Sequence, residues 1–216
     1  MTGIAPGPAR RALDLLVTVP TLVVLGPPLL VLMAAIRLTG RGPALFRQQR
    51  VGQGGECFEI CKLRTMRRGT AGPDVTARDD PRVTRLGAVL RRTSLDELPQ
   101  LWNVLRGEMT LVGPRPETPA LAARYPAGCR WVFAHRPGIT GPTQVRLRDT
   151  MALPGGAEVD VERYLAELVP ARTALDATYL DRPTVSATLR VLAETALHLL
   201  GRPVPAPARS AVRTAR

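Results

Sequence analysis

The sequence predicts an α+β, mainly helical protein with a re-entrant N-terminal membrane helix followed by a compact cytoplasmic domain. Three observations predict this fold class. An almost wholly apolar run covers residues 12–36, two strand-like segments flank a glycine-rich turn, and later apolar residues recur at helical spacing. With 216 residues, 45% of them hydrophobic, the chain is long enough for one medium domain and a membrane element.

The apolar run is the most N-terminal element, and arginines flank both of its ends: Arg10, Arg11, Arg37 and Arg41. Its length of about 25 residues would allow one straight span. Pro20 and the triplet Gly26-Pro27-Pro28 would bend a helix near its middle. Arginines at both ends also lack the asymmetry of a simple span. We therefore predict that the helix turns in the membrane and leaves on the face it entered. A single span and a cleaved signal peptide are the alternatives, although no small-x-small cleavage site follows.

The segment after the membrane helix predicts a β-hairpin. Residues 44–51 and 56–63 flank Gly52-Gln53-Gly54-Gly55, which tolerates positive φ. The polar, Gly/Pro-rich residues 67–82 predict a mobile loop. Helices are predicted at residues 83–92, 95–105, 121–132, 159–168 and 172–200, with Gly107 ending the second and a glycine-rich loop at 154–156.

The pattern predicts four regions along the chain. They are a basic N-terminal segment (1–11), the re-entrant membrane helix (12–38), the compact domain (39–200) and a disordered basic tail (201–216). The last predicted helix has a strong apolar face, which favours an amphipathic interfacial position on the bilayer surface.

The composition limits the classes of molecule that the protein is expected to bind. The chain has 30 Lys and Arg against 18 Asp and Glu, a net charge of +12, which favours nucleic acid, anionic lipid headgroups or nucleotide substrates. With three Phe, three Tyr and two Trp, stacking platforms for bases are scarce, so we predict no nucleic-acid partner. The three cysteines (Cys57, Cys61 and Cys129) form neither a CxxC pair nor a His-rich cluster, and each is predicted to fill the core.

The adjacent carboxylates Asp96 and Glu97 are the candidate catalytic pair. Ser94-x-x-Glu97 fits a capping box, and capping alone would explain both acids. Yet Arg91, Arg92, Arg106 and Arg115 surround them. An acid can attack or bind metal while arginines hold phosphate oxygens, so the set favours chemistry on a phosphate ester.

Other basic residues are candidate phosphate-binding residues. Two proline-bounded turns, Gly113-Pro114-Arg115-Pro116 and Arg136-Pro137-Gly138, present one arginine each, which suits bidentate binding of a diphosphate. Lys62, the chain's only lysine, and Arg64 would share one face of the second strand. Two explanations of a lysine at position 62 are equally good. The position prefers a compact ammonium group, or the lysine was retained by chance.

Four motifs fall in order along the chain: KLRTM at 62–66, SLDELPQLWNVL at 94–105, VGPRP at 112–116 and RPGITG at 136–141. Together they resemble the bacterial sugar transferase family, the monotopic phosphoglycosyl transferases, over residues 10–200. The resemblance implies transfer of a sugar-1-phosphate from a UDP-sugar to polyprenyl (undecaprenyl) phosphate, with Mg²⁺ as cofactor. It also implies a location on the cytoplasmic face of the bacterial cell membrane and a role in exopolysaccharide or glycoconjugate synthesis.

The resemblance assigns roles to individual residues. Asp96 is expected to be the nucleophile that carries the phosphosugar, and Glu97 its partner, with both near the magnesium ion. Substrate- or phosphate-binding residues are expected at Lys62, Arg64, Arg91, Arg115, Arg136 and Asp176, the last by a looser alignment. Gly26-Pro27-Pro28 stands where the family commonly pairs serine with proline, and Pro142 stands where many members carry tryptophan. The sugar is therefore not predicted.

Two alternatives remain at this point. A non-catalytic, membrane-anchored scaffold of a polysaccharide assembly complex needs the same fold, but it does not need the intact carboxylate pair. A basic nucleic-acid-binding protein is suggested by charge alone and leaves the apolar N-terminus without a role. The oligomeric state is open, with a homodimer as one option.

Overall fold

A computed structural model of the protein describes residues 2–40, 42–67, 69, 80–147, 161–202 and 204. The described residues are mainly helical with two small two-stranded sheets, in agreement with the predicted α+β class. Most of the predicted loop at 67–82, the whole loop at 154–156 and nearly all of the tail at 201–216 lie outside the described residues.

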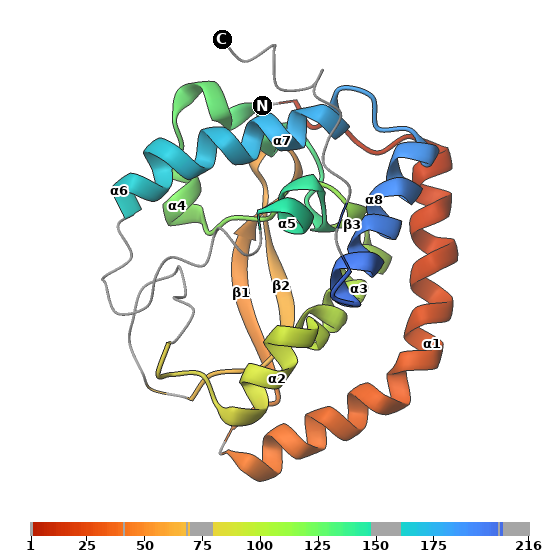
Figure 1. Ribbon diagram of the computed structural model, residues 1–216, viewed down its shortest axis with the longest axis vertical. Coiled ribbons are helices and arrows are strands. Elements are labelled where there is room, and N and C mark those ends of the chain that lie inside the picture. Colours follow the sequence, from red (N-terminus) through yellow and green to blue (C-terminus); the bar gives the residue numbers. More distant parts are fainter. Residues whose placement is uncertain are drawn as a thin grey trace.

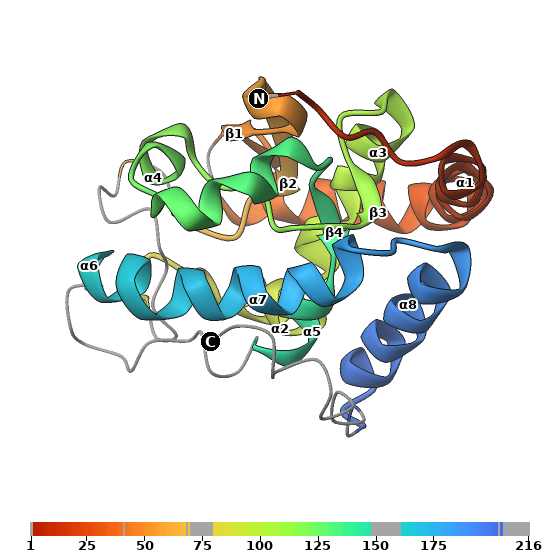
Figure 2. The same ribbon diagram turned by 90° about the horizontal axis from the view of Figure 1, so that it is seen from above.

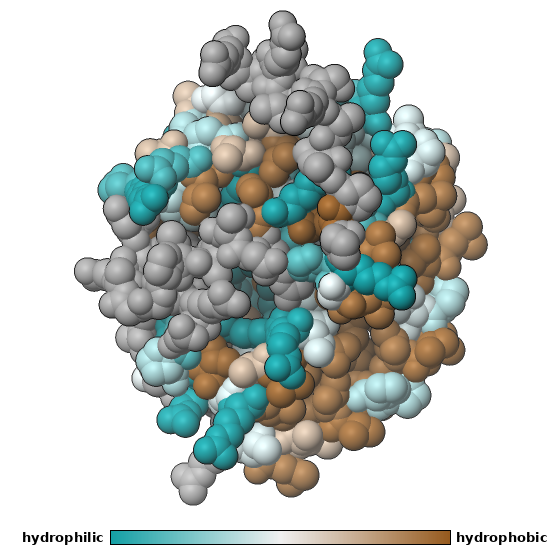
Figure 3. Space-filling model, viewed as in Figure 1, coloured by the Kyte–Doolittle hydropathy of each residue, from teal (hydrophilic) through white to brown (hydrophobic). Residues whose placement is uncertain are grey.

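The apolar run forms α1 (Pro8–Thr39), one continuous helix of 32 residues with Pro20, Pro27 and Pro28 inside it. Figure 1 shows that α1 bends partway along its length and wraps around one side of the domain. A bend is expected because each proline removes a backbone donor and clashes with the preceding turn. Within the described part of the chain, α1 alone has the length and composition to cross a membrane. Its apolar side chains are largely exposed, and Figure 3 shows them gathered along that edge.

The start of α1 is held by polar contacts rather than by apolar packing. Asp14 is 1% exposed and accepts hydrogen bonds from Thr110 Oγ1 (2.7 Å) and the Leu111 amide (3.1 Å). Arg10 donates from Nη2 to the Val112 carbonyl at 3.0 Å. The basic N-terminal segment therefore docks on the domain, which its charge alone did not indicate.

The hairpin is confirmed. Strands β1 (Leu45–Val51) and β2 (Cys57–Leu63) pair antiparallel, with Phe46 opposite Lys62. They are joined by a short 3₁₀ turn, η1 (Gln53–Gly55), in which Gly54 has a φ of 73°. The core-filling prediction holds for the buried Cys129 but is wrong for Cys57, which is exposed beside the hairpin turn.

The segment after α2 (Arg85–Thr93) carries the carboxylates of Asp96 and Glu97. Helix α2 ends at Ser94, whose φ of 58° is left-handed, and a 3₁₀ segment η2 (Leu95–Gln100) follows. The predicted α-helix begins later, as α3 (Leu101–Arg106), and Gly107 ends it as expected. The early part is 3₁₀ because Pro99 supplies no amide proton for an α-helical bond.

A second, parallel strand pair was not predicted. β3 (Thr110–Val112) pairs with β4 (Gly138–Thr140), placing the VGPRP and RPGITG segments side by side. The backbones approach so closely that a Cβ on Gly138 would lie 2.1 Å from the Gly113 nitrogen. Glycine is therefore required at this crossing. Strands of three residues carry no usable periodicity, which is why the pattern missed them.

The predicted helix at 121–132 is wrong. Two short elements replace it, α4 (Pro119–Ala123) and the 3₁₀ segment η3 (Ala127–Ala134), because Pro126 interrupts the run. A short α5 (Pro142–Arg146) follows β4.

The boundary predicted between the last two helices is also wrong. α6 (Val161–Arg163), the π-helical segment η4 (Tyr164–Leu168) and α7 (Val169–Leu180) run on without a gap, and α8 (Val185–Leu199) follows. The helix continues through Pro170, directly after the π-helical turn, and the chain breaks at Pro183 instead. The altered hydrogen-bond pattern of the π turn accommodates a residue that has no amide donor. Figure 2 shows α8 beside α1. Its predicted interfacial position stays a prediction.

Candidate active site

The carboxylate pair lies where η2 packs against β2. Lys62 donates from Nζ to Glu97 Oε1 at 2.7 Å, and Arg115 Nη1 lies 3.9 Å from the same oxygen. The Ser94 side chain makes no capping hydrogen bond to η2, so the capping box is not formed. Two cations from distant parts of the chain therefore converge on one carboxylate, an arrangement that capping does not require.

Asp96 is the more buried acid, with 8% of its surface exposed. Burial and the neighbouring charge of Glu97 raise the pKa of Asp96 to about 6, against the lowering effect of Lys62 and Arg91. A carboxylate with a raised pKa is a stronger nucleophile than an exposed one and is still mostly ionised at neutral pH.

Arg91 is oriented toward this pair from α2. Its Nε donates to Thr65 Oγ1 at 2.9 Å, which holds the guanidinium in place. Burial lowers the pKa of Arg91, and the charges of Asp96 and Asp80 act to raise it. Arginine remains charged, so Arg91 supplies a fixed positive charge beside Asp96.

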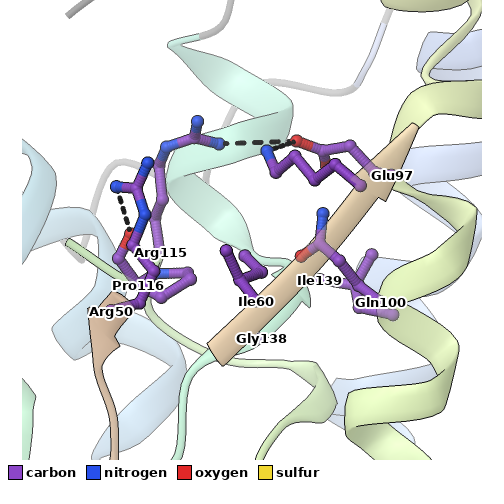
Figure 4. A pocket seen from close by; sticks show the side chains of 9 residues that line it. Arg50, Ile60, Glu97, Gln100, Arg115, Pro116, Gly138 and Ile139 are labelled. Atoms are coloured by element: carbon purple, nitrogen blue, oxygen red, sulfur yellow. Dashed lines mark hydrogen bonds and ion pairs between the residues drawn. The ribbon is translucent and has the colours of Figure 1, made fainter. Parts of the chain in front are cut away.

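A small pocket opens between these groups. It is lined by Arg50, Ile60, Lys62, Glu97, Gln100, Arg115, Pro116, Gly138 and Ile139. Figure 4 shows Glu97 and Gln100 on one side and Arg50 and Arg115 on the other. Two polar lining residues, Arg50 and Gln100, were not predicted as site residues. The i, i+3 spacing from Glu97 could have indicated Gln100, whereas nothing in the pattern indicated Arg50, which donates to the Pro116 carbonyl at 3.3 Å.

Arg64 does not join the pocket. Its Nη2 donates to the carbonyls of Ile36 (2.9 Å) and Gly40 (2.8 Å), at the C-terminal end of α1. β2 ends at Leu63, although the Arg64 amide still donates to the Ala44 carbonyl at 2.7 Å. The predicted shared face with Lys62 stays a prediction, but the Arg64 side chain contacts the end of α1 and not Glu97. Arg64 instead satisfies carbonyls that a helix end leaves without partners.

Arg136 also points elsewhere. Its Nε donates to Gln53 Oε1 at 3.1 Å, in the hairpin turn. Burial lowers the pKa of Arg136, and the nearby charge of Arg11 lowers it further. Arg136 precedes β4, so it is Gly138, not Arg136, that reaches the pocket.

Asp176 lies in a separate buried cluster on α7. It is 4% exposed, and its Oδ1 accepts from Thr143 Oγ1 at 2.7 Å. Burial raises the pKa of Asp176 to about 6, partly offset by the Thr143 hydrogen bond and by Arg172. The interactions of Asp176 are with Thr143, Arg172 and Glu117, not with the cations around Asp96 and Glu97. The structure therefore does not place it with that pair.

The raised pKa of Asp176 gives a testable pH dependence. Because its folded-state pKa lies above the unfolded value, protonation favours the folded state, and this contribution is lost as pH rises through about 6. We expect Asp176→Asn to melt higher than wild type by a margin that grows between roughly pH 4 and pH 6 and stays constant above that range. Thermal unfolding in detergent across this range tests it. A margin that does not change with pH contradicts the assignment.

Comparison with known proteins identifies the family. The sequence profile of the bacterial sugar transferases matches residues 6–202. The chain belongs to the bacterial sugar transferase family.

The similarity to individual relatives agrees with this family assignment. The chain is 43% identical over 204 residues to the UDP-glucose:undecaprenyl-phosphate glucose-1-phosphate transferase of Caulobacter vibrioides, covering 88% of this chain and 69% of the relative. It is 36% identical to the exopolysaccharide production protein PSS of Rhizobium leguminosarum bv. phaseoli, covering 89% and 96%. An undecaprenyl-phosphate glucose phosphotransferase of Komagataeibacter xylinus is 47% identical, but only 27% of its length is covered.

In this sugar transferase the carboxylate pair is the candidate magnesium site. Among the described residues no group of three or more His, Cys, Asp or Glu side chains is arranged to hold a metal ion. Magnesium often uses only one or two carboxylates, with water and substrate phosphates as its other ligands. The oxygen donors of Asp96 and Glu97, next to a pocket lined by Lys62 and Arg115, fit that requirement.

Proposed function

We propose that the protein transfers a sugar-1-phosphate from a UDP-sugar to polyprenyl phosphate at the cytoplasmic face of the bacterial cell membrane. The reaction releases UMP and starts exopolysaccharide or glycoconjugate assembly. The observation that carries the proposal is the convergence of Lys62 and Arg115 on Glu97, next to the buried Asp96. The functions of the Caulobacter and Komagataeibacter relatives support it.

In the first step a carboxylate oxygen of Asp96 attacks the phosphorus that bears the sugar. A bond forms between Asp96 and phosphorus, the bond to the UMP oxygen breaks, and UMP leaves. Lys62 and Arg115 bind the phosphate oxygens, where fixed cations stabilise the charge of the transition state. Magnesium held by Asp96 and Glu97 would supply further neutralisation of the diphosphate charge.

In the second step an oxygen of polyprenyl phosphate attacks the same phosphorus. The bond between phosphorus and Asp96 breaks, which regenerates the carboxylate and yields the polyprenyl diphosphate sugar. An acyl phosphate is reactive enough to be displaced in this way, and this is the chemical advantage of a carboxylate nucleophile.

We infer the position of the protein on the membrane from the contacts between the two ends of α1 and the domain. Arg10, at its start, donates to the Val112 carbonyl, and Arg64 donates to the Ile36 and Gly40 carbonyls at its end. Both ends of α1 therefore contact one domain. A transmembrane helix would place its ends on opposite sides of a ~30 Å hydrocarbon core. The contacts, together with the bend, support a re-entrant helix that places the pocket near the lipid headgroups.

The test is UMP release by detergent-purified protein with magnesium, polyprenyl phosphate and a panel of UDP-sugars. We expect UMP release with one or two of the sugars, dependent on polyprenyl phosphate for multiple turnovers. No release with any sugar, together with no binding of any UDP-sugar, would instead support the non-catalytic scaffold.

A further inference from the structure

A buried amide in the pocket has no hydrogen-bond partner among the residues that the structure describes. Gln100 is 2% exposed, and its Nε2 makes no hydrogen bond. Buried polar groups are almost always hydrogen-bonded, and an unsatisfied one costs about 1–3 kcal/mol. Gln100 is also one of the residues that line the pocket between Lys62, Glu97 and Arg115.

The surroundings of Gln100 define what its amide can bind. The Nε2 group is a donor and needs an acceptor. The cations Lys62 and Arg115 face the same pocket, with Lys62 2.7 Å from Glu97 Oε1. Figure 4 shows Gln100 projecting from the same segment as Glu97, opposite Arg115. The polar lining residues are three cations (Arg50, Lys62 and Arg115), one carboxylate (Glu97) and the neutral donor Gln100. This excess of donors matches a phosphate oxygen of a nucleoside diphosphate, which accepts hydrogen bonds.

We propose that Gln100 is a substrate-binding residue whose amide donates to a phosphate oxygen of the UDP-sugar. The proposal rests on the proposed function, since it names a contact to that donor substrate. The uncompensated amide then represents stability given up for binding, because its hydrogen bond forms only when the substrate is present.

A substrate-binding role and a structural role of Gln100 predict different effects on stability. Methionine has nearly the shape of glutamine and no donor, so Gln100→Met removes the unsatisfied group without opening a cavity. We expect Gln100→Met to melt at the wild-type temperature or above it. A structural glutamine would lower the melting temperature when replaced.

The experiment measures UDP-sugar affinity by titration calorimetry on full-length protein in detergent with magnesium. An Asp96→Asn background is used so that the bound donor is not consumed. Adding Gln100→Met should weaken binding about tenfold to a hundredfold, the effect of losing a hydrogen bond to a charged group. Gln144→Met is the matched control, because the Gln144 amide is also buried without a partner but does not line the pocket. We expect its affinity to be unchanged.

Each outcome is decisive. Unchanged affinity in Gln100→Met overturns this proposal and leaves the proposed function intact, provided that the Asp96→Asn parent binds the donor. Weaker binding together with a lower melting temperature overturns it in favour of a structural role. If the parent binds no UDP-sugar and wild type releases no UMP, both proposals fail.

Discussion

Asp96→Asn is expected to abolish turnover, with UMP release falling by at least about a thousandfold. The amide has the size of the carboxylate but cannot form the acyl phosphate. Folding should be preserved, since burial raises the pKa of Asp96 and the neutral form is therefore tolerated at this position. The measurement is UMP release with the donor found in the sugar panel.

Wild-type kinetics supply a second measurement of the same step. A covalent intermediate predicts ping-pong kinetics, with parallel double-reciprocal lines when UDP-sugar and polyprenyl phosphate are varied. Asp176→Asn is the matched control, because it makes the same change in another buried aspartate, which interacts with Thr143 and Arg172 instead of the cations beside Asp96. Turnover near the wild-type rate in Asp96→Asn would sink the assignment of the nucleophile.

Glu117→Ala is expected to give the largest loss of stability. Glu117 Oε1 accepts from Arg172 Nη1 at 2.8 Å and from the hydroxyls of Tyr125 and Tyr164, each at 3.0 Å. Both ionic side chains are 5% exposed. Removing the carboxylate leaves Arg172 buried without this partner, which costs about 3–5 kcal/mol. The melting temperature should fall by roughly 6–20 °C for a chain of this size.

A surface pair provides the control for this loss. Arg124 and Glu162 also form an ion pair, but the Glu162 side chain is 80% exposed. Exposed pairs contribute little because solvent screens them, so Glu162→Ala should leave the melting temperature nearly unchanged. Equal effects of Glu117→Ala and Glu162→Ala would contradict the role of the buried cluster. Because Glu117 follows Arg115 by two residues, we also expect weaker UDP-sugar binding in Glu117→Ala.

Elements with strong local signals were predictable from the sequence. The apolar α1, the hairpin around its glycine turn and the stop at Gly107 each carry such a signal. The β3–β4 pair is too short to show periodicity, and its partners lie far apart in the sequence. The helix boundaries failed near Pro126 and Pro183, where apolar spacing was followed through a proline.

The sequence indicated only part of the candidate site, because contacts between distant segments leave no local pattern. The motif order indicated Asp96, Glu97, Lys62 and Arg115, and the structure brings Glu97, Lys62 and Arg115 together. A cation in a motif does not reveal which group it faces, and Arg64 faces helix carbonyls instead. The docking of Arg10 and Asp14 was hidden because charges beside an apolar run resemble ordinary membrane flanks.

Intact-mass spectrometry of the full-length protein tests the central claim most directly. The protein is incubated with magnesium and the UDP-sugar that supports UMP release, but without polyprenyl phosphate. We predict a mass increase equal to one sugar phosphate, located on Asp96 by peptide mapping and lost when polyprenyl phosphate is added. UMP release that needs polyprenyl phosphate from the first turnover, with no adduct formed, would contradict the covalent mechanism.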